Sequence, residues 1–166
     1  MVKLRALEPS DLDILYSWEN DDRVWFSSSN TRPVSKQTLQ FFIDSINDIY
    51  TDKQVRLVIE HENTPVGCVD LFDFEPLHQR AGVGIMIDEN HEGKSLAHEA
   101  LKELQNYAFN QLGLHQLYCN VSQNNERSIH LFNRSGFMHT ATRKEWVKEG
   151  KNWYDQFIFQ CFNNSK

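Results

Sequence analysis

The sequence predicts one domain of mixed α/β (α+β) class, spanning residues 1–166, with helices around a run of antiparallel strands. The chain has 166 residues, 40% of them hydrophobic, so it can bury a core without a disulfide or a metal. Runs of β-branched and aromatic residues in the middle of the chain are separated by turn-like segments, which predicts strands. A strong helical period follows these runs. Strands and helices therefore belong to one mixed fold.

Two helices are expected between a short first strand and the central strands. The first follows residues 8–11 and carries Leu12, Leu15 and Tyr16 at helical spacing. Residues 27–33 are rich in Ser, Asn and Pro, which is typical of a loop. Ser35 can then cap a second helix, whose apolar face consists of Leu39, Phe42, Ile43 and Ile46.

The rest of the chain predicts an antiparallel meander, a long helix, and then strands around a short helix. The meander strands are expected at 55–60, 66–74 and 80–88. The long helix starts near Leu96, should stop at Gly113, and has an apolar stripe of Ala97, Ala100, Leu101, Leu104 and Ala108. A strand at 114–121, a helix at 126–135 and strands at 138–147 and 152–162 follow. The predicted order is β-α-α-β-β-β-α-β-α-β-β.

Composition excludes several classes of function. The net charge of −6 argues against nucleic-acid binding, which needs a basic face, and mildly favours cationic partners. Cys68, Cys119 and Cys161 lie far apart among apolar neighbours. This favours buried free thiols in a reducing compartment. No stretch has the length and apolar character of a signal peptide or a membrane span. We expect a cytoplasmic protein that binds neither nucleic acid nor membrane.

The junction between the last meander strand and the long helix, residues 88–97, favours an anion site. A helix that begins at about Ser95 leaves backbone N–H groups unpaired and a partial positive charge at its start. Gly93 allows close approach of a ligand, and Lys94 adds a cation. A pyrophosphate suits such a site, although the same residues would also serve as a plain connecting loop.

Three segments together resemble the GNAT family of acetyl-coenzyme A-dependent N-acetyltransferases. They are the strand at 84–88 (Gly-Ile-Met-Ile-Asp), the helix start at 92–97 (Glu-Gly-Lys-Ser-Leu-Ala), and residues 125–137, which carry the pattern Asn-x-x-Ser-x-x-Leu-Phe-x-x-x-Gly-Phe. Residues 18–20 (Trp-Glu-Asn) and 78–81 (His-Gln-Arg-Ala) resemble the branch that holds ribosomal-protein N-terminal and spermidine acetyltransferases. The resemblance covers nearly the whole chain.

The resemblance implies a GNAT-like mixed, mostly antiparallel central sheet flanked by helices, with acetyl-CoA as co-substrate. It assigns the cofactor to Met86 and Ile87 along the pantetheine arm, and to the pyrophosphate loop of Glu92, Gly93, Lys94, Ser95, Leu96 and Ala97. It also implies a splay between the third meander strand and the next strand. Asn125, Phe132 and Arg134 would contact the cofactor from the short helix. Each has an alternative: Asn125 as a helix cap, Phe132 in the core, and Arg134 in solvent.

The sequence departs from the family pattern in its phosphate loop. That pattern is Gln or Arg, two residues, Gly, one residue, then Gly or Ala, and the three positions hold Glu92, Ser95 and Ala97. Glu92 should repel a pyrophosphate unless it points to solvent or pairs with Lys94. Ser95 fits only if its backbone avoids positive φ, and it is also a good helix cap.

The usual catalytic side chains are absent as well. Gly82 and Phe132 hold the positions where many family members have a Glu base and a Tyr acid. The replacements we consider are Asp70 or Asp73 as base and Tyr118 as acid, against the alternatives that the carboxylates are solvated and the tyrosine lies in the core.

The acceptor site is predicted near the end of the first helix. Trp18 and Glu19 are candidate acceptor-binding residues together with Asp73. Trp18, Trp25 and Phe26 could wall the acceptor pocket or fill the core. Acidic residues at a helix C-terminus oppose the dipole, which suggests a role beyond solvation. No metal is expected, since the His and Cys spacings fit no zinc pattern.

We therefore expect transfer of an acetyl group from acetyl-CoA to a primary amine by direct attack in a ternary complex. The acceptor could be a polyamine, another small amine or a protein N-terminus. The alternatives are a non-catalytic or regulatory acyl-CoA-binding domain and a purely structural interaction module. The resemblance also permits a homodimer.

Overall fold

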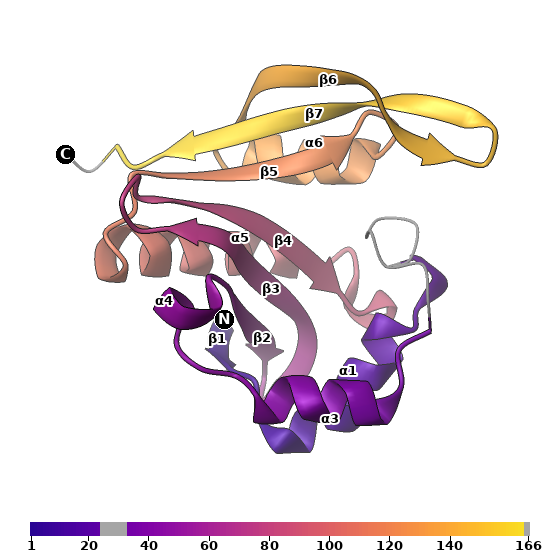
Figure 1. Cartoon of the computed structure of the whole chain (residues 1–166), viewed down its shortest axis with the longest axis vertical. Coiled ribbons are helices and arrows are strands. Elements are labelled where there is room, and N and C mark those ends of the chain that lie inside the picture. The colour runs from indigo at the N-terminus through magenta and orange to yellow at the C-terminus, as the bar shows by residue number, and fades with distance from the viewer. Residues whose placement is uncertain (24–32, 165–166) are drawn as a thin grey trace.

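The computed structural model describes residues 1–23 and 33–164, whose strands form one seven-stranded sheet in the order β1-β2-β3-β4-β5-β7-β6 (Figure 1). Neighbouring strands are antiparallel except for β4 and β5, which are parallel. This confirms the predicted mixed, mostly antiparallel sheet. The strands are β1 Val2–Ala6, β2 Val55–His61, β3 Thr64–Glu75, β4 Arg80–Ile87, β5 Gln116–Ser122, β6 Met138–Glu149 and β7 Asn152–Phe162.

Helices cover both faces of the sheet in the predicted order. Those described are α1 Leu12–Glu19, α3 Lys36–Asp44, α4 Ile49–Asp52, α5 Leu96–Asn106 and α6 Glu126–Arg134, with short 3-10 turns η1 Pro9–Asp11 and η2 Glu89–His91. Helices α1 and α3 lie on one side and α5 on the other (Figure 1). The loop predicted at 27–33 lies outside the described residues except for Pro33.

The two-residue period of the strands separates two cores. On β2 and β3, Ile59 and Val69 pack in the main cluster with Leu101 and Leu104 of α5. Their neighbours Val58 and Cys68 face the opposite way and pack with Trp18 of α1. Because consecutive strand residues point to opposite faces, each face of the sheet is buried by its own helices.

Three local features differ from the prediction. Helix α4 was not predicted, since it has only four residues and depends on Asp48, whose carboxylate caps the N–H groups of Tyr50 and Thr51. The long helix changes to a π-helical turn, η3 Tyr107–Gln111, instead of continuing to Gly113. The second helix ends at Asp44, so Ile46 is partly exposed rather than on its apolar face.

The parallel pair β4 and β5 opens the sheet next to α5. Their pairing covers only three positions, from Arg80 with Gln116 to Gly82 with Tyr118. Beyond Gly82, β4 continues to Ile87 paired only with β3. The predicted splay between these strands is confirmed, and it exposes the inner edge of β4 to a ligand.

Among the described residues, no helix has the length and apolar character needed to cross a membrane.

Candidate functional site

A pocket of about 480 Å³ lies where β4 ends and α5 begins. Its walls come from the end of β4, the connection to α5, and α6. It is lined by nine of the residues predicted to hold the cofactor: Met86, Ile87, Glu92, Gly93, Ser95, Leu96, Ala97, Asn125 and Arg134. The other two lie outside the lining, since Lys94 is exposed to solvent and Phe132 is buried edge-to-face against Phe137. Phe132 therefore takes the core position that was its alternative.

Ser95 adopts the backbone conformation that it was expected to avoid. Its φ is 60° and its side chain makes no capping hydrogen bond, so both expectations for this residue were wrong. A left-handed conformation costs a non-glycine residue about 1–2 kcal/mol. The turn leaves the first amide groups of α5 without a side-chain cap, and uncapped amides at a helix start bind anions.

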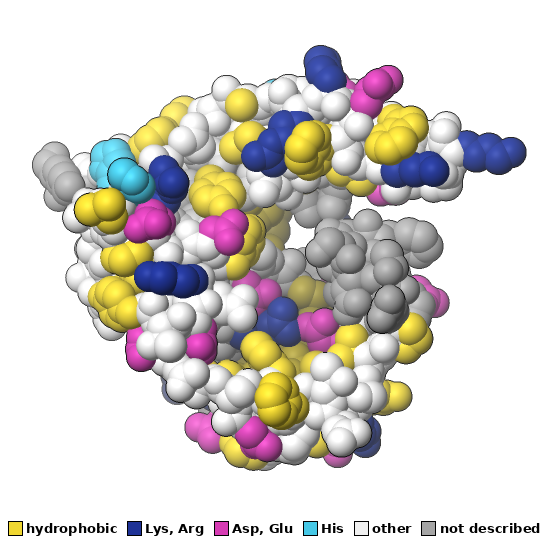
Figure 2. Space-filling model, viewed as in Figure 1, with side chains coloured by type: hydrophobic (Ala, Val, Ile, Leu, Met, Phe, Trp, Pro, Cys, Tyr) yellow, Lys and Arg dark blue, Asp and Glu magenta, His cyan; other side chains and the backbone are white. Residues whose placement is uncertain are grey.

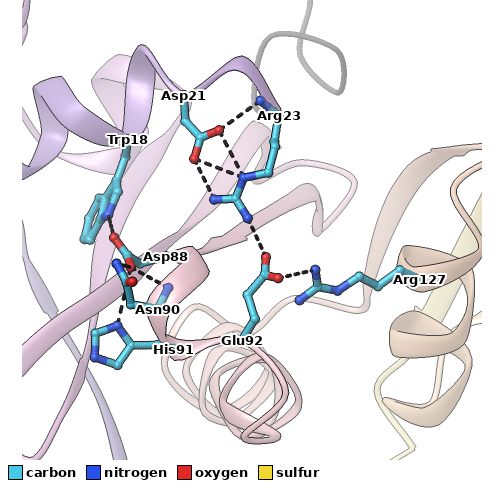
Figure 3. Close-up of polar contacts among 8 residues, drawn as sticks. All are labelled: Trp18, Asp21, Arg23, Asp88, Asn90, His91, Glu92 and Arg127. Atoms are coloured by element: carbon cyan, nitrogen blue, oxygen red, sulfur yellow. Dashed lines mark hydrogen bonds and ion pairs between the residues drawn. The ribbon is translucent and has the colours of Figure 1, made fainter.

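Glu92 is paired, although not with Lys94. Its Oε1 accepts a hydrogen bond from Arg23 at 2.9 Å, and its Oε2 lies 2.7 Å from the guanidinium of Arg127 (Figure 3). Arg23 follows α1 and Arg127 belongs to α6, so Glu92 connects two elements on opposite sides of the pocket. The two cations offset the negative charge that the sequence placed beside the phosphate site.

The turn after β4 is fixed by Asp88. Its Oδ2 accepts a hydrogen bond from the indole N–H of Trp18 at 3.0 Å, and its Oδ1 accepts one from the backbone of Asn90 (Figure 3). Burial disfavours the Asp88 anion, but these hydrogen bonds outweigh it and lower the pKa of the carboxyl. Trp18 is buried and lies outside the lining of this pocket and of the second pocket described below, so its position is that of a core residue rather than of an acceptor-binding one.

Asn125 caps α6 and also lines the pocket. Its Oδ1 accepts a hydrogen bond from the backbone N–H of Ser128 at 3.1 Å. The side-chain nitrogen has no hydrogen-bond partner within residues 1–23 and 33–164, so it can donate to a ligand. The helix cap, one of the two alternatives, is thus present and leaves the amide N–H₂ available.

The expected base position on β4 is filled rather than empty. A Cβ at Gly82 would lie 2.4 Å from the ring of Phe72, so the aromatic side chain occupies the space that a Glu side chain would need. At Gly84 a Cβ would meet only the Asp70 side chain, at 3.8 Å. The carboxylate of Asp70 therefore lies over β4 one pleat away from the usual base position.

A second pocket of about 780 Å³ opens on the face covered by α1 and α3. Its lining includes Glu19, Arg56 and Asp70, and Arg56 links the other two. Arg56 donates to both oxygens of Asp70, at 2.8 and 2.9 Å, and also to Glu19. Burial disfavours its cation, but Asp70 and Glu19 more than compensate and raise the pKa of Arg56. Figure 2 shows this face hollowed, with charged side chains of both signs inside the hollow.

Tyr118 and Asp73 form a pair at the edge of that face. The phenol O–H donates to Asp73 at 3.0 Å, and its ring packs edge-to-face on Phe72. Burial and the neighbouring carboxylate raise the pKa of Tyr118 to about 12. The phenol stays protonated at neutral pH, as an acid requires, but neither residue belongs to the lining of either pocket.

Comparison with known proteins decides the family. The acetyltransferase (GNAT) domain family matches residues 2–138. The chain belongs to the GNAT acetyltransferase family. A spermidine N(1)-acetyltransferase of Escherichia coli K12 is 32% identical over 145 residues, which cover 82% of this chain and 72% of that protein.

A further curated relative comes from the predicted branch, and a solved structure has the same fold. A putative ribosomal N-acetyltransferase of Bacillus subtilis is 22% identical over 149 residues, covering 87% of this chain and 81% of the relative. The crystal structure of a Vibrio cholerae spermidine N-acetyltransferase in complex with CoA and spermine superposes with a TM-score of 0.88 at 24% identity, covering 97% of this chain and 95% of that one.

The first pocket fits the cofactor of a GNAT enzyme. It combines uncapped amides at the start of α5, the side-chain nitrogen of Asn125, and cations from two parts of the chain: Arg23 after α1, and Arg127 and Arg134 on α6. The unpaired edge of β4 at Met86 and Ile87 leads away from these groups. Anion-binding groups at one end and an open strand edge at the other suit a molecule with phosphates and a long arm.

Sequence reasoning missed three arginines in these pockets. Arg23 and Arg56 gave no local signal, because each is recognised only by partners far along the chain. Arg127 lies inside the pattern at 125–137, but at a position that the pattern leaves open. Its reach across the pocket to Glu92 is visible only in three dimensions.

Proposed function

We propose that this GNAT enzyme transfers the acetyl group of acetyl-CoA to a cationic primary amine by direct attack in a ternary complex. The single observation that carries the proposal is the first pocket, where an uncapped helix start, a capping asparagine with a free N–H₂ group and an unpaired strand edge meet. When bound there, acetyl-CoA supplies the activated thioester. The residues of the chain bind and orient the reactants.

The second pocket supports a cationic acceptor. Among the described residues, its ionisable lining residues are Glu19, Asp52, Asp70 and Arg56, three carboxylates against one guanidinium. A surplus of negative charge in a partly enclosed site attracts a cationic amine. Asp70 of β3 lines the second pocket and pairs with Gly84 of β4. Ile85, Met86 and Ile87 of β4 line the first pocket, so the two pockets lie at neighbouring positions of two paired strands. The names of the spermidine acetyltransferase relatives favour a polyamine over a protein N-terminus.

Proton transfer has to use groups other than a strand β4 glutamate. An alkyl ammonium with a pKa near 10 must lose a proton before its nitrogen attacks the thioester carbon. Both oxygens of Asp70 are engaged by Arg56, so we assign Asp70 to attraction of the ammonium and the proton to water. As the N–C bond forms and the C–S bond breaks, the nitrogen gives up its second proton to water, and the thiolate of CoA takes up a proton from solvent. Tyr118 is protonated at neutral pH but lies outside the lining of both pockets, so solvent is the favoured proton donor.

The second candidate function is a non-catalytic acyl-CoA-binding domain. The observation in its favour is that Phe72 fills the usual base position and Phe132 is buried where many relatives have a tyrosine. Catalysis by this chain must therefore come from binding and orientation of an already activated thioester.

A panel assay tests the proposal against that alternative. The protein is mixed with acetyl-CoA and, separately, with spermidine, a short diamine, a monoamine and a peptide with a free N-terminus, and release of the CoA thiol is followed. We expect turnover with the polycations and a kcat/KM that decreases as the positive charge of the acceptor decreases. CoA binding without thiol release on any acceptor would favour the non-catalytic domain, and no binding of CoA would exclude both.

A further inference from the structure

The ion pairs of Glu92 span the cofactor pocket. Glu92 and Arg127 both belong to its lining and come from different elements, the β4–α5 connection and α6. Their charged atoms are 2.7 Å apart, and Arg23 lies 2.9 Å from the other oxygen of Glu92. Figure 3 shows the carboxylate between the two guanidinium groups. A protein carboxylate thus occupies a place between two cations beside the start of α5.

The two arginines are held to very different degrees. Arg23 also donates to Asp21 from both its Nε and a terminal nitrogen, and these hydrogen bonds to the carboxylate raise the pKa of Arg23. Arg127 has a side chain that is 67% exposed, and Glu92 is the one ionic partner recorded for it in the described part of the chain. Exposed ion pairs contribute little stability. Arg127 can therefore exchange its partner at low cost, whereas Arg23 is anchored.

A diphosphate is a better partner for Arg127 than a carboxylate. It offers more acceptor oxygens and more negative charge, and a guanidinium can bind phosphate through two parallel hydrogen bonds. Glu92 uses one oxygen for each arginine and therefore gives Arg127 a single-point contact. An incoming diphosphate would meet Arg127 already turned toward the first turn of α5.

We propose that Arg127 is a diphosphate-binding residue of the cofactor site and that Glu92 is an internal anion that competes with the cofactor for it. In the free protein Glu92 holds Arg127 across the pocket, and the diphosphate displaces it while Arg23 keeps Glu92 in place. The three side chains carry one net positive charge, which accounts for a glutamate where the family pattern has glutamine or arginine. This inference rests on the proposed cofactor function.

Calorimetric titration with CoA tests the competition. Arg127→Gln weakens binding about tenfold, because one charge-assisted phosphate contact is lost. Glu92→Gln tightens it by about three- to tenfold, because Arg127 is released and a nearby negative charge is removed. Glu126→Gln is the matched control: it removes the carboxylate of the residue next to Arg127 in the sequence, which does not belong to the pocket lining, and it leaves CoA affinity unchanged.

The double variant separates competition from simple repulsion. If Glu92 competes for Arg127, the gain from Glu92→Gln shrinks in the Arg127→Gln background. If Glu92 merely repels the cofactor, the gain stays the same or grows, because Arg127 no longer screens the carboxylate. The second result would overturn the proposal. Unfolding by urea checks that each variant is folded before it is titrated.

Cofactor fragments identify the phosphate that Arg127 binds. 3′-Dephospho-CoA keeps the diphosphate and pantetheine has no phosphate at all. We expect the penalty of Arg127→Gln to be equal for CoA and 3′-dephospho-CoA and absent for pantetheine. A penalty that disappears with 3′-dephospho-CoA would assign Arg127 to the 3′-phosphate and refute the diphosphate contact.

Failure of this inference is distinguishable from failure of the proposed function. Wild-type protein that binds no CoA overturns the function itself. If wild-type protein binds CoA and Arg127→Gln binds it with the same affinity, the proposed function stands and the role of Arg127 is overturned.

Discussion

Replacing Gly82 by alanine should destabilise the protein, because Phe72 fills the space above this strand position. A Cβ at Gly82 would lie 2.4 Å from Cε2 and 2.5 Å from Cζ of Phe72. The ring has to move, and overpacking of this kind costs about 1–3 kcal/mol. Phe72 is only half-buried, so we expect the lower part of that range, about 1–2 kcal/mol.

Gly84→Ala is the matched control. It lies on the same face of β4, and its Cβ would meet nothing closer than 3.8 Å. Both variants change the freedom of the unfolded chain equally, so that contribution cancels in the comparison. With a urea dependence of about 2 kcal/mol per molar, the unfolding midpoint of Gly82→Ala should lie about 0.5–1 M below that of Gly84→Ala.

Equal midpoints for the two alanine variants would refute this reasoning. A further check uses Phe72→Leu, which shortens the obstructing side chain: in that background, Gly82→Ala should cost less than in the wild type. The same packing implies that Gly82→Glu does not restore a base at this position, because its carboxylate would be displaced by the ring.

Two further predictions concern carboxylates. Asp11 is buried and accepts two hydrogen bonds from Arg5. Asp11→Asn should therefore lower the free energy of unfolding by about 1–3 kcal/mol, after allowing for the partial exposure of Arg5. Asp13→Asn is the control, because Asp13 belongs to an exposed ion pair, and it should leave the urea midpoint unchanged. The Arg5 hydrogen bond lowers the pKa of Asp11 below its unfolded value near 4, so its stabilisation is complete above that pH and is lost as pH falls further. Acid titration of stability should show this loss in wild type and Asp13→Asn but not in Asp11→Asn. At the acceptor site, Asp70→Asn should raise KM for a dicationic amine several-fold and leave kcat nearly unchanged; a large fall in kcat at constant KM would make Asp70 the base.

Most of the fold was predictable because it follows from the spacing of apolar residues. Strands β2 and β3 show a long two-residue period, and α5 carries a long helical stripe of apolar residues. Because each pattern buries a face of the sheet, both could be recognised in the sequence. Helix α4 depends on one aspartate cap, and the change to a π-helical turn at Tyr107 has no counterpart in the apolar stripe. Such features depend on local hydrogen bonds that periodicity does not report.

Most of the lining of the first pocket could be named from the sequence because it lies in two continuous segments, 85–98 and 125–134. Its role as the cofactor site stays a prediction. What the sequence could not show is how charges from distant segments meet. Glu92 looked like an unfavourable charge until its pairs with Arg23, 69 residues away, and with Arg127 were known. Ser95 looked like a cap, but the backbone of the turn imposes a left-handed conformation on it. Both cases are tertiary effects that override a local preference.

Acetyl transfer to a cationic amine is tested most directly by the steady-state rate of CoA thiol release from acetyl-CoA with spermidine as acceptor. We predict saturable release with spermidine and a clearly lower kcat/KM with a monoamine that carries no second charge. The rate should rise with pH as the attacking amine loses its proton. The decisive contrary result is tight CoA binding with no thiol release above the rate of spontaneous hydrolysis for any amine in the panel.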